Sequence, residues 1–320
     1  MKRESFGSRL GFILVSAGCA IGIGNVWKFP YICGAYGGAA FILIYLCFLV
    51  ILGIPVLVAE FAVGRGSHTS VAKCFDKLAP AGSCWKPLKF IGIIGCYMLM
   101  MFYTTVGGWM IYYCVKSLRG DFVGATPEAV TQSFSDMLGN APTMMLWMVI
   151  ICLIGFAVCF MGLQNGIEKI SKVMMSALLI IMVILAVHSV MMEGAGEGIR
   201  FYLVPDFQKI KEAGVGNVVF AALSQSFFTL SIGIGAMLIF GSYLDKSRSL
   251  TGEAVSITVL DTFVALTAGF IIIPACFSYG IQPDYHSAQY FCKDERRGFV
   301  GKSVLPVSDI CCGFNDHCCI

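Results

Sequence analysis

A run of glycines and polar residues interrupts the first long apolar segment of this 320-residue chain, between Ser16 and Pro30. Glycine weakens a helix and leaves backbone carbonyls without amide partners, and Asn25 adds a side-chain carbonyl. Unpaired carbonyls are costly in hydrocarbon, so broken backbone persists at membrane depth only where it lines a cavity or binds a ligand. The interrupted segment therefore predicts a binding site.

The oxygens near this interruption suit a hard cation such as sodium, which takes several oxygen ligands, as calcium does. Asp261 lies about ten residues, or ~15 Å, into a later apolar segment. A carboxylate at that depth is a functional candidate, although one nearer a helix end could simply reach water. The predicted donors are the backbone carbonyls of Gly18, Ala20 and Ile21, the Asn25 amide, the Thr229 hydroxyl and the Asp261 carboxylate.

An amino acid could satisfy both of its charges at the same place. Half-helix N-termini near Gly22 present free N–H groups to a carboxylate. Carbonyls near Ala20, Phe228 and Ser231 would accept from an ammonium group. Tyr103 could add a phenolic donor, although an aromatic residue in a membrane helix is also typical of packing or of the interfacial belt.

Two charged side chains leave alternatives open. Lys28 either reaches the membrane surface with its ammonium group or belongs to an external gate, with Gln225 as its hydrogen-bonding neighbour. Glu60 either pairs with Arg65 or braces the second interrupted helix described below.

The elements that must position these residues are membrane helices. The chain is 58% hydrophobic and 13% charged, more apolar than a soluble domain of this size. Crossing the hydrocarbon core takes about 20 apolar residues. Seven segments are long enough: 9–31, 38–63, 88–117, 142–162, 167–192, 214–241 and 252–280. We therefore predict an all-α polytopic membrane protein, and the net charge of +3 does not indicate a nucleic-acid partner.

Lys and Arg residues predict the orientation of these helices. They concentrate before the first segment, in 65–89, in 169–172 and in 246–248, whereas the alternate loops are longer and acidic or mixed. The positive-inside rule then places the N terminus in the cytoplasm of a multi-pass protein of the cell (inner) membrane. No cleavable signal peptide is evident, because the first apolar run has glycine breaks and no cleavage site.

The sixth segment is interrupted as well, between Gln225 and Gly235, by hydroxyl residues and two glycines. Interrupted helices in the first and sixth positions are typical of an inverted-repeat secondary transporter.

Four motifs together resemble the neurotransmitter:sodium symporters, in their bacterial amino-acid branch. They are the residues 9–14, 18–30, 53–65 and 225–235. The resemblance covers about residues 3–284. It implies the inverted-repeat sodium symporter fold of the leucine transporter, with helices 1 and 6 broken and the fold cut after helix 7.

The resemblance also implies site residues. The amino-acid pocket would be formed by Gly22, Leu99, Tyr103, Phe228, Ser231 and Ile234. The first sodium site would use Ala20, Asn25, Thr229 and Asp261 together with the substrate carboxylate, and half of a second site would use Gly18 and Ile21. Arg3 would be the inner-gate arginine, and Leu99 with Ile234 indicates an apolar substrate side chain.

Two positions depart from the family pattern. Asp261 stands where many relatives have Asn, and Ala265 replaces the serine that chloride-dependent members use. A fixed carboxylate could stand in for chloride, so we expect transport without a chloride requirement.

The character of the chain changes after residue 284. Residues 1–284 are predicted to be the transporter domain and 285–320 an aberrant tail. The tail has five cysteines, but two adjacent Cys pairs with His317 do not match the spacing of zinc sites. A shifted reading frame is the favoured explanation, because a frame-shifted reverse translation of 285–301 can spell a sequence like the expected continuation of the family.

The predicted function is sodium-coupled amino-acid symport by alternating access. Sodium is the expected coupling ion, the lipid bilayer and a small-molecule amino acid are the expected partners, and no cofactor is expected. The printed chain is expected to be truncated and unable to complete transport. The alternative is a non-transporting membrane protein that binds a ligand or partner. An enzyme is not expected, because no nucleophile–base pair stands out, and the sequence does not predict the oligomeric state.

Overall fold

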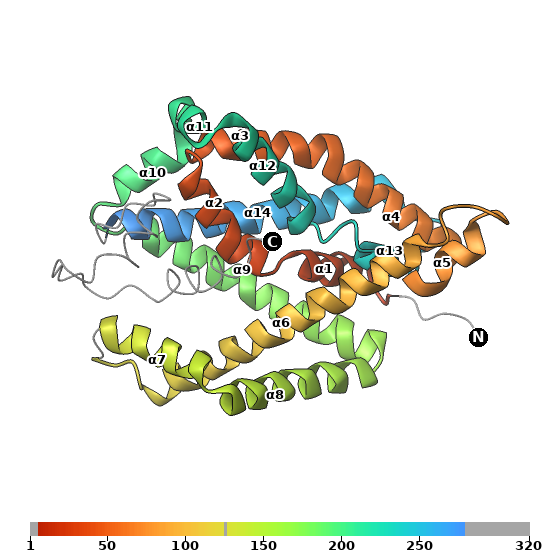
Figure 1. Ribbon diagram of the computed structural model, residues 1–320, viewed down its shortest axis with the longest axis horizontal. Helices are drawn as coiled ribbons and strands as arrows, with labels where there is room; N and C mark the ends of the chain where they lie inside the picture. The colour runs from red at the N-terminus through yellow and green to blue at the C-terminus, as the bar shows by residue number, and fades with distance from the viewer. Residues whose placement is uncertain (1–5, 125–126, 279–320) are drawn as a thin grey trace. The chain divides into compact units, whose positions relative to one another are not determined.

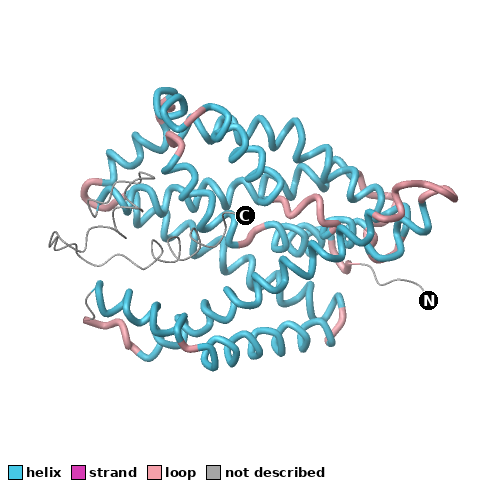
Figure 2. The backbone as a smooth tube through the Cα atoms, in the orientation of Figure 1, coloured by secondary structure: helices cyan, strands magenta, loops and turns pink. Residues whose placement is uncertain are grey.

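The computed structural model describes residues 6–124 and 127–278, and every regular element among them is a helix (Figures 1 and 2). Arg3 and the tail 285–320 lie outside the described residues. The chain divides into two units, one formed by residues up to Tyr97 together with Val158–Ser278, the other containing Met98–Ala157. Each unit is described by itself.

The first apolar segment forms two helices separated by a break. Helix α1 (Arg9–Ala20) begins at Ser8, whose side chain caps the Gly11 amide. After the break, a π-helical turn, η1 (Gly24–Lys28), leads into α2 (Phe29–Ala35). The helical pieces on either side, Arg9–Ala20 and Gly24–Ala35, are bent by 59°.

The next segments are continuous. Helix α3 (Ala39–Phe48), π-helical η2 (Leu49–Gly53) and α4 (Ile54–Ser67) form one span of 29 residues. The short α5 (Val71–Leu78) follows, and α6 (Leu88–Arg119) begins in the first unit and continues into the second.

The rest of the first unit returns after the second. π-helical η3 (Leu163–Glu168) continues as α9 (Lys169–Val190), followed by α10 (Ala195–Leu203) and α11 (Phe207–Ala213). Asp206 caps α11, as the Pro-Asp start signal in the sequence predicts. Helices α12 (Val215–Thr229), α13 (Ala236–Gly241) and α14 (Leu250–Ser278) complete the unit.

Helix α14 lies at the centre of the first unit, where it packs against α9, α10, α1, α2 and α4. Small residues permit the closest approaches. A Cβ at Gly269 of α14 would overlap the Tyr202 ring, and the buried Tyr202 hydroxyl donates to the carbonyl oxygen of Leu266 at 3.0 Å. Burial raises the pKa of Tyr202. Packing of this kind fixes the position of α14, and with it that of Asp261.

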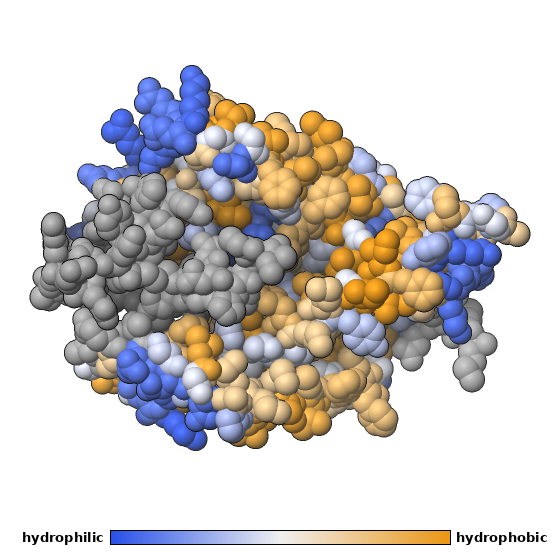
Figure 3. All heavy atoms as spheres, viewed as in Figure 1, coloured by the Kyte–Doolittle hydropathy of each residue, from blue (hydrophilic) through white to orange (hydrophobic). Residues whose placement is uncertain are grey.

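The second unit contains the outer part of α6, α7 (Pro127–Gly139) and most of α8 (Ala141–Phe160). Large apolar side chains stay exposed along α8, among them Leu153 at 62% and Phe156 at 76%. Hydrophobic residues cover much of the visible surface (Figure 3). Such exposure is expected where lipid rather than water surrounds the helices.

Six of the seven predicted spans correspond to membrane-length helical segments. Five described helices are long and apolar enough to cross a membrane, and the bent pair makes up to six. The predicted span 214–241 differs, because it consists of α12 and the six-residue α13, separated by a turn at 230–235.

Candidate functional site

The interruption of the first segment begins at Ile21, whose backbone is extended (ψ 107) and whose amide makes the last α1 bond, to Ala17. The Gly22 amide donates to the side-chain oxygen of Asn25 at 3.3 Å. A continuous helix would direct that amide to the carbonyl of Gly18. The break therefore places the carbonyls at the end of α1 where a ligand could use them.

The interruption between α12 and α13 is a turn that a carboxylate braces. Ser231, Gly233 and Gly235 all have positive φ, a conformation that glycine adopts without steric cost. Glu60 of α4 accepts from the Gly233 amide at 2.6 Å and from the Leu238 amide at 3.2 Å. Arg65 instead donates to the backbone of Arg248. Of the two alternatives for Glu60, the structure shows the brace.

The two interruptions contact each other directly. The Ser231 hydroxyl donates to the Cys19 carbonyl at 3.1 Å, and the Gln225 side-chain amide donates to the Gly24 carbonyl at 3.1 Å. Gly24 packs so closely on Phe228 that a Cβ there would overlap the aromatic ring. The broken backbone of one segment is thus paired with side chains of the other.

A buried polar cluster joins three elements beside these breaks. Asn25 Nδ2 donates to Asp261 Oδ1 at 2.8 Å and to Thr229 Oγ1 at 3.0 Å, and Thr229 Oγ1 donates to Asp261 Oδ2 at 2.8 Å. All three side chains are fully buried. The cluster brings η1, the end of α12 and the middle of α14 together around one carboxylate.

When it is ionised, Asp261 carries a charge that its neighbours only partly balance. Its donors are a neutral amide and a neutral hydroxyl, and no Lys, Arg or His of the described residues forms an ion pair with it. Burying an unpaired carboxylate costs several kcal/mol. A cation bound beside Asp261 would remove this cost.

The expected bond between Lys28 and Gln225 does not form in the described part of the chain. Lys28 Nζ lies 4.4 Å from the centroid of the Phe228 ring, a cation–π contact, while Gln225 donates to Gly24. The Phe228 ring, which packs directly on Gly24, takes the ammonium group instead, and the Gly24 carbonyl accepts from both the Gln225 amide and the Phe29 backbone amide.

The remaining predicted site residues fall in several places. Ala20 and Ile21 are buried at the end of α1, and Ile234 lies in the 230–235 turn, where it approaches Gly95 of α6. Leu99 and Tyr103 belong to the second unit, so their part in the pocket stays a prediction.

Tyr45 is a neighbour of the cluster that the sequence did not single out. It is fully buried on α3 and interacts electrostatically with Asp261. A tyrosine within an apolar segment is indistinguishable from a packing residue in the sequence, and only the packing of α3 against α12 reveals its location.

This arrangement, with apolar helices, two breaks that meet and a buried carboxylate beside them, defines a multi-pass membrane protein of the secondary-transporter type.

The chain belongs to the sodium:neurotransmitter symporter family, which its residues 3–133 and 128–280 match. This is a family of transporters rather than enzymes. The match confirms the resemblance seen in the four motifs.

Relatives and a solved structure agree with this assignment. The chain is 37% identical over 283 residues to YhdH, an uncharacterised sodium-dependent transporter of Bacillus subtilis, covering 88% of this chain and 62% of YhdH. It is 28% identical over 312 residues to the sodium-dependent serotonin transporter of Drosophila melanogaster, covering 84% of this chain and 48% of the relative. The crystal structure of MhsT in complex with L-phenylalanine superposes with a TM-score of 0.80 at 38% identity, covering 89% of this chain and 64% of MhsT.

The chain spans about three fifths of the length of the bacterial and archaeal relatives it matches, 56% for MJ1319 of Methanocaldococcus jannaschii and 62% for YhdH. The fold of the described residues is that of the sodium symporters.

Proposed function

We propose that this chain carries the sodium and amino-acid binding core of a sodium-coupled symporter. The single observation that supports this most is the buried Asp261 carboxylate, which meets Asn25 and Thr229 where the two breaks converge. A binding site that closes over a cation would neutralise its charge, and the amino acid would lie against the adjacent backbone.

The proposed first sodium site consists of the Ala20 carbonyl, the Asn25 side-chain oxygen, the Thr229 hydroxyl and the Asp261 carboxylate, with the substrate carboxylate as a further ligand. Asn25 now presents its Nδ2 to Asp261. Sodium binding would require this amide to rotate so that its oxygen replaces the nitrogen, because the amide nitrogen is a hydrogen-bond donor with no lone pair to offer a cation. Gly18 and Ile21 would contribute carbonyls to a second site.

The proposed substrate is an amino acid with an apolar side chain, in a pocket formed by Gly22, Leu99, Tyr103, Phe228, Ser231 and Ile234. MhsT, the structural relative, was crystallised with L-phenylalanine. Phenylalanine and leucine are therefore the first ligands to test.

Equilibrium binding tests this proposal directly. The purified chain in nanodiscs should bind radiolabelled phenylalanine or leucine saturably in sodium chloride, and at least tenfold more weakly in potassium chloride of equal ionic strength. Binding of equal affinity in both salts would refute sodium coupling. Binding that depends on pH but not on sodium would indicate that a proton takes the place of the cation at Asp261.

Chloride independence follows from the same carboxylate. Ala265 lies one turn beyond Asp261 and is fully buried without a hydroxyl to offer an anion. We expect sodium-dependent binding to be unchanged when gluconate replaces chloride. A loss of binding in gluconate would show that Asp261 does not substitute for the anion.

A non-transporting membrane protein that binds a ligand or a partner through the two contacting breaks is the second candidate. The reading-frame hypothesis for residues 285–320 belongs to this candidate, and sequencing the coding DNA across codons 280–320 tests it. Sodium-promoted binding without uptake into proteoliposomes would favour this candidate, whereas uptake of labelled amino acid would exclude it.

A further inference from the structure

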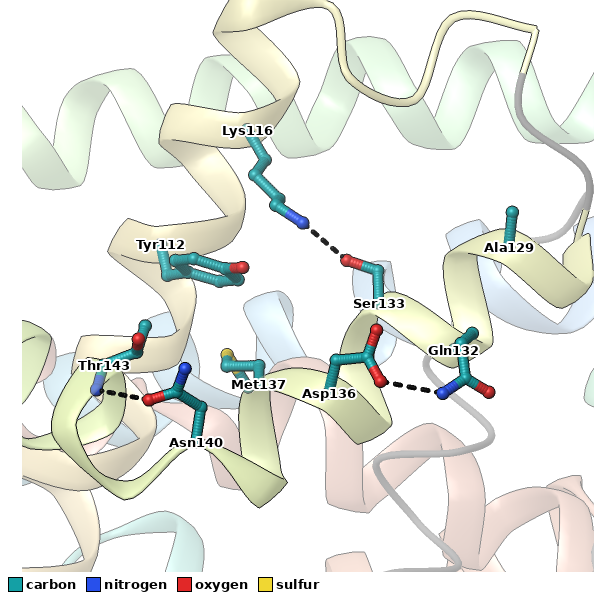
Figure 4. A pocket seen from close by; sticks show the side chains of 9 residues that line it. All are labelled: Tyr112, Lys116, Ala129, Gln132, Ser133, Asp136, Met137, Asn140 and Thr143. Atoms are coloured by element: carbon teal, nitrogen blue, oxygen red, sulfur yellow. Dashed lines mark hydrogen bonds between the residues drawn. The ribbon is translucent and has the colours of Figure 1, made fainter.

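A pocket of about 360 Å³ lies in the second unit, between the last turns of α6, the helix α7 and the first turn of α8 (Figure 4). Its volume is in the range of small-molecule sites. Polar side chains line most of it, above the buried Met137. None of the residues that line it belongs to the predicted sodium or amino-acid site.

The pocket contains one positive and one negative group that do not pair. Lys116 Nζ donates to Ser133 Oγ at 2.7 Å and lies 5.1 Å from the centroid of the Tyr112 ring. Asp136 lies nearly one turn beyond Ser133 on α7 and accepts from Gln132 Nε2 at 2.7 Å (Figure 4). Among the side chains that the structure describes, neither charge forms an ion pair, so a ligand with both signs of charge matches this lining best.

Aromatic residues place the pocket at the boundary between lipid and water. Trp109 packs on Phe134, Tyr112 on Trp147 and Tyr113 on Phe122, with ring centroids 5.9, 6.0 and 5.7 Å apart. Trp and Tyr are enriched where membrane helices reach the headgroup region. The positions of the helices agree, because the apolar span of α6 ends at Arg119 and that of α8 begins at Ala141.

An exposed apolar stripe follows α8, the helix whose first turn borders the pocket. Met145, Val149, Leu153 and Phe156 are spaced three or four residues apart, so they share one helix face, and they are 60%, 47%, 62% and 76% exposed. At 100° per residue this face points away from Thr143 at the pocket, so it is a lipid-facing surface of α8 beside the pocket rather than a part of it.

We propose that the pocket binds the headgroup of an aminophospholipid. The lipid phosphate would pair with Lys116 beside Ser133, its primary ammonium group would pair with Asp136, and its acyl chains would extend into the surrounding bilayer. An anionic lipid without an ammonium group would pair with Lys116 only, and its negative charge would be repelled by Asp136.

Native mass spectrometry of the delipidated full-length chain, titrated with phosphatidylethanolamine or phosphatidylglycerol, tests this proposal. We expect the unchanged chain to retain phosphatidylethanolamine at least fivefold more strongly than phosphatidylglycerol. Lys116→Gln should reduce the retention of both lipids, whereas Asp136→Asn should reduce only that of phosphatidylethanolamine. Circular dichroism of each variant reports whether its helices persist.

Arg119→Gln and Asp121→Asn are matched controls, because these residues lie at the same end of α6 but do not line the pocket. Both controls should retain lipid like the unchanged chain. The proposal is overturned if folded K116Q and D136N variants retain phosphatidylethanolamine normally, if the controls lose it equally, or if D136N affects both lipids alike.

Discussion

At the scale of single residues, Asp261 determines the electrostatics of the candidate site. Its carboxylate is fully buried and its donors, Asn25 and Thr229, are neutral. The folded chain therefore pays a desolvation cost that only a bound cation or proton can remove. Ion binding at this one side chain would therefore stabilise the packing of η1, α12 and α14, which meet at the carboxylate.

Replacing Asp261 with Asn should have two opposite effects. Without sodium, Asp261→Asn should raise the melting temperature, because it removes a buried charge worth several kcal/mol while retaining an oxygen for Thr229. With sodium, the variant should lose the ligand-induced stabilisation that the unchanged chain shows. Thermal unfolding followed by size-exclusion chromatography, in sodium and in potassium, measures both effects.

Glu197→Gln is the control for this comparison, because Glu197 is an exposed carboxylate on α10. It should leave both melting temperatures unchanged. Stabilisation of the Asp261→Asn variant by sodium, to the same degree as the unchanged chain, would show that the carboxylate is not a sodium ligand.

Sequence reasoning predicted some residues of this site better than others. Asp261 was predictable because a carboxylate deep in an apolar segment requires a reason. The bond of Gln225 to the Gly24 carbonyl was not predictable, because it depends on how α12 packs against η1. Glu60 could be assigned only once the structure showed its distances to Gly233 and Leu238.

At the scale of elements, the turn between α12 and α13 depends on a helix distant in sequence. Glu60→Gln should weaken this turn, because the neutral amide keeps one acceptor oxygen and loses the second, charged one. Hydrogen bonds to a charged group are worth about 1.5–3 kcal/mol each. We expect faster hydrogen exchange in residues 230–238 and at least a tenfold loss of amino-acid affinity.

The exchange measurement includes its own reference, since peptides from α9 do not contact Glu60 and should exchange unchanged. If residues 230–238 exchange at the original rate in Glu60→Gln, the turn is stable without the carboxylate and the proposed brace is wrong.

Gly64 of α4 and Gly241 of α13 set how closely these two helices pack. A Cβ at Gly241 would meet the backbone of Phe61, which cannot move aside as a flexible side chain could. Gly241→Ala should therefore destabilise the fold by about 1–3 kcal/mol. Gly216→Ala, where a Cβ meets open space in α12, should cause no loss, since alanine favours helix. Equal melting temperatures for the two variants would contradict this account.

The helices themselves were largely predictable from hydrophobic length, as α6 and α14 show. The expected range 88–117 begins where Leu88–Arg119 begins and ends two residues earlier. The expected range 252–280 begins two residues after the start of Leu250–Ser278 and ends two residues beyond it. The π-helical turns η1, η2 and η3 could not be predicted, because extra residues per turn arise from packing and leave no mark in hydrophobicity.

At the scale of the whole molecule, the proposed orientation rests on the distribution of basic residues. The loop 79–87 is expected in the cytoplasm, and Cys84 is exposed there. A membrane-impermeant maleimide should label Cys84 in inside-out but not in right-side-out vesicles, with Cys84→Ser as the blank. Met191 follows the C-terminal end of α9, which is expected on the outer side of the membrane. In a Cys84→Ser background, Met191→Cys should therefore be labelled in right-side-out but not in inside-out vesicles. Labelling of Cys84 from outside would reverse the proposed topology.

The family and the fold could be inferred from the sequence because four motifs retain their order and spacing over residues 3–284. The pocket at Lys116 and Asp136 could not be inferred from the sequence. These residues are 20 positions apart, and only the packing of α7 beside α6 brings them to one cavity.

The backbone of Ser231 has a consequence for the energetics of the site. Its φ of 51° lies in the left-handed region, which costs a non-glycine residue about 1–2 kcal/mol. The hydroxyl bond to the Cys19 carbonyl offsets part of that cost. The Glu60 bonds to the Gly233 and Leu238 amides hold the rest of the turn in place, so the strained backbone at Ser231 persists only while these partners remain. A ligand that draws the Cys19 carbonyl away from the Ser231 hydroxyl would therefore remove part of the support for this strained conformation.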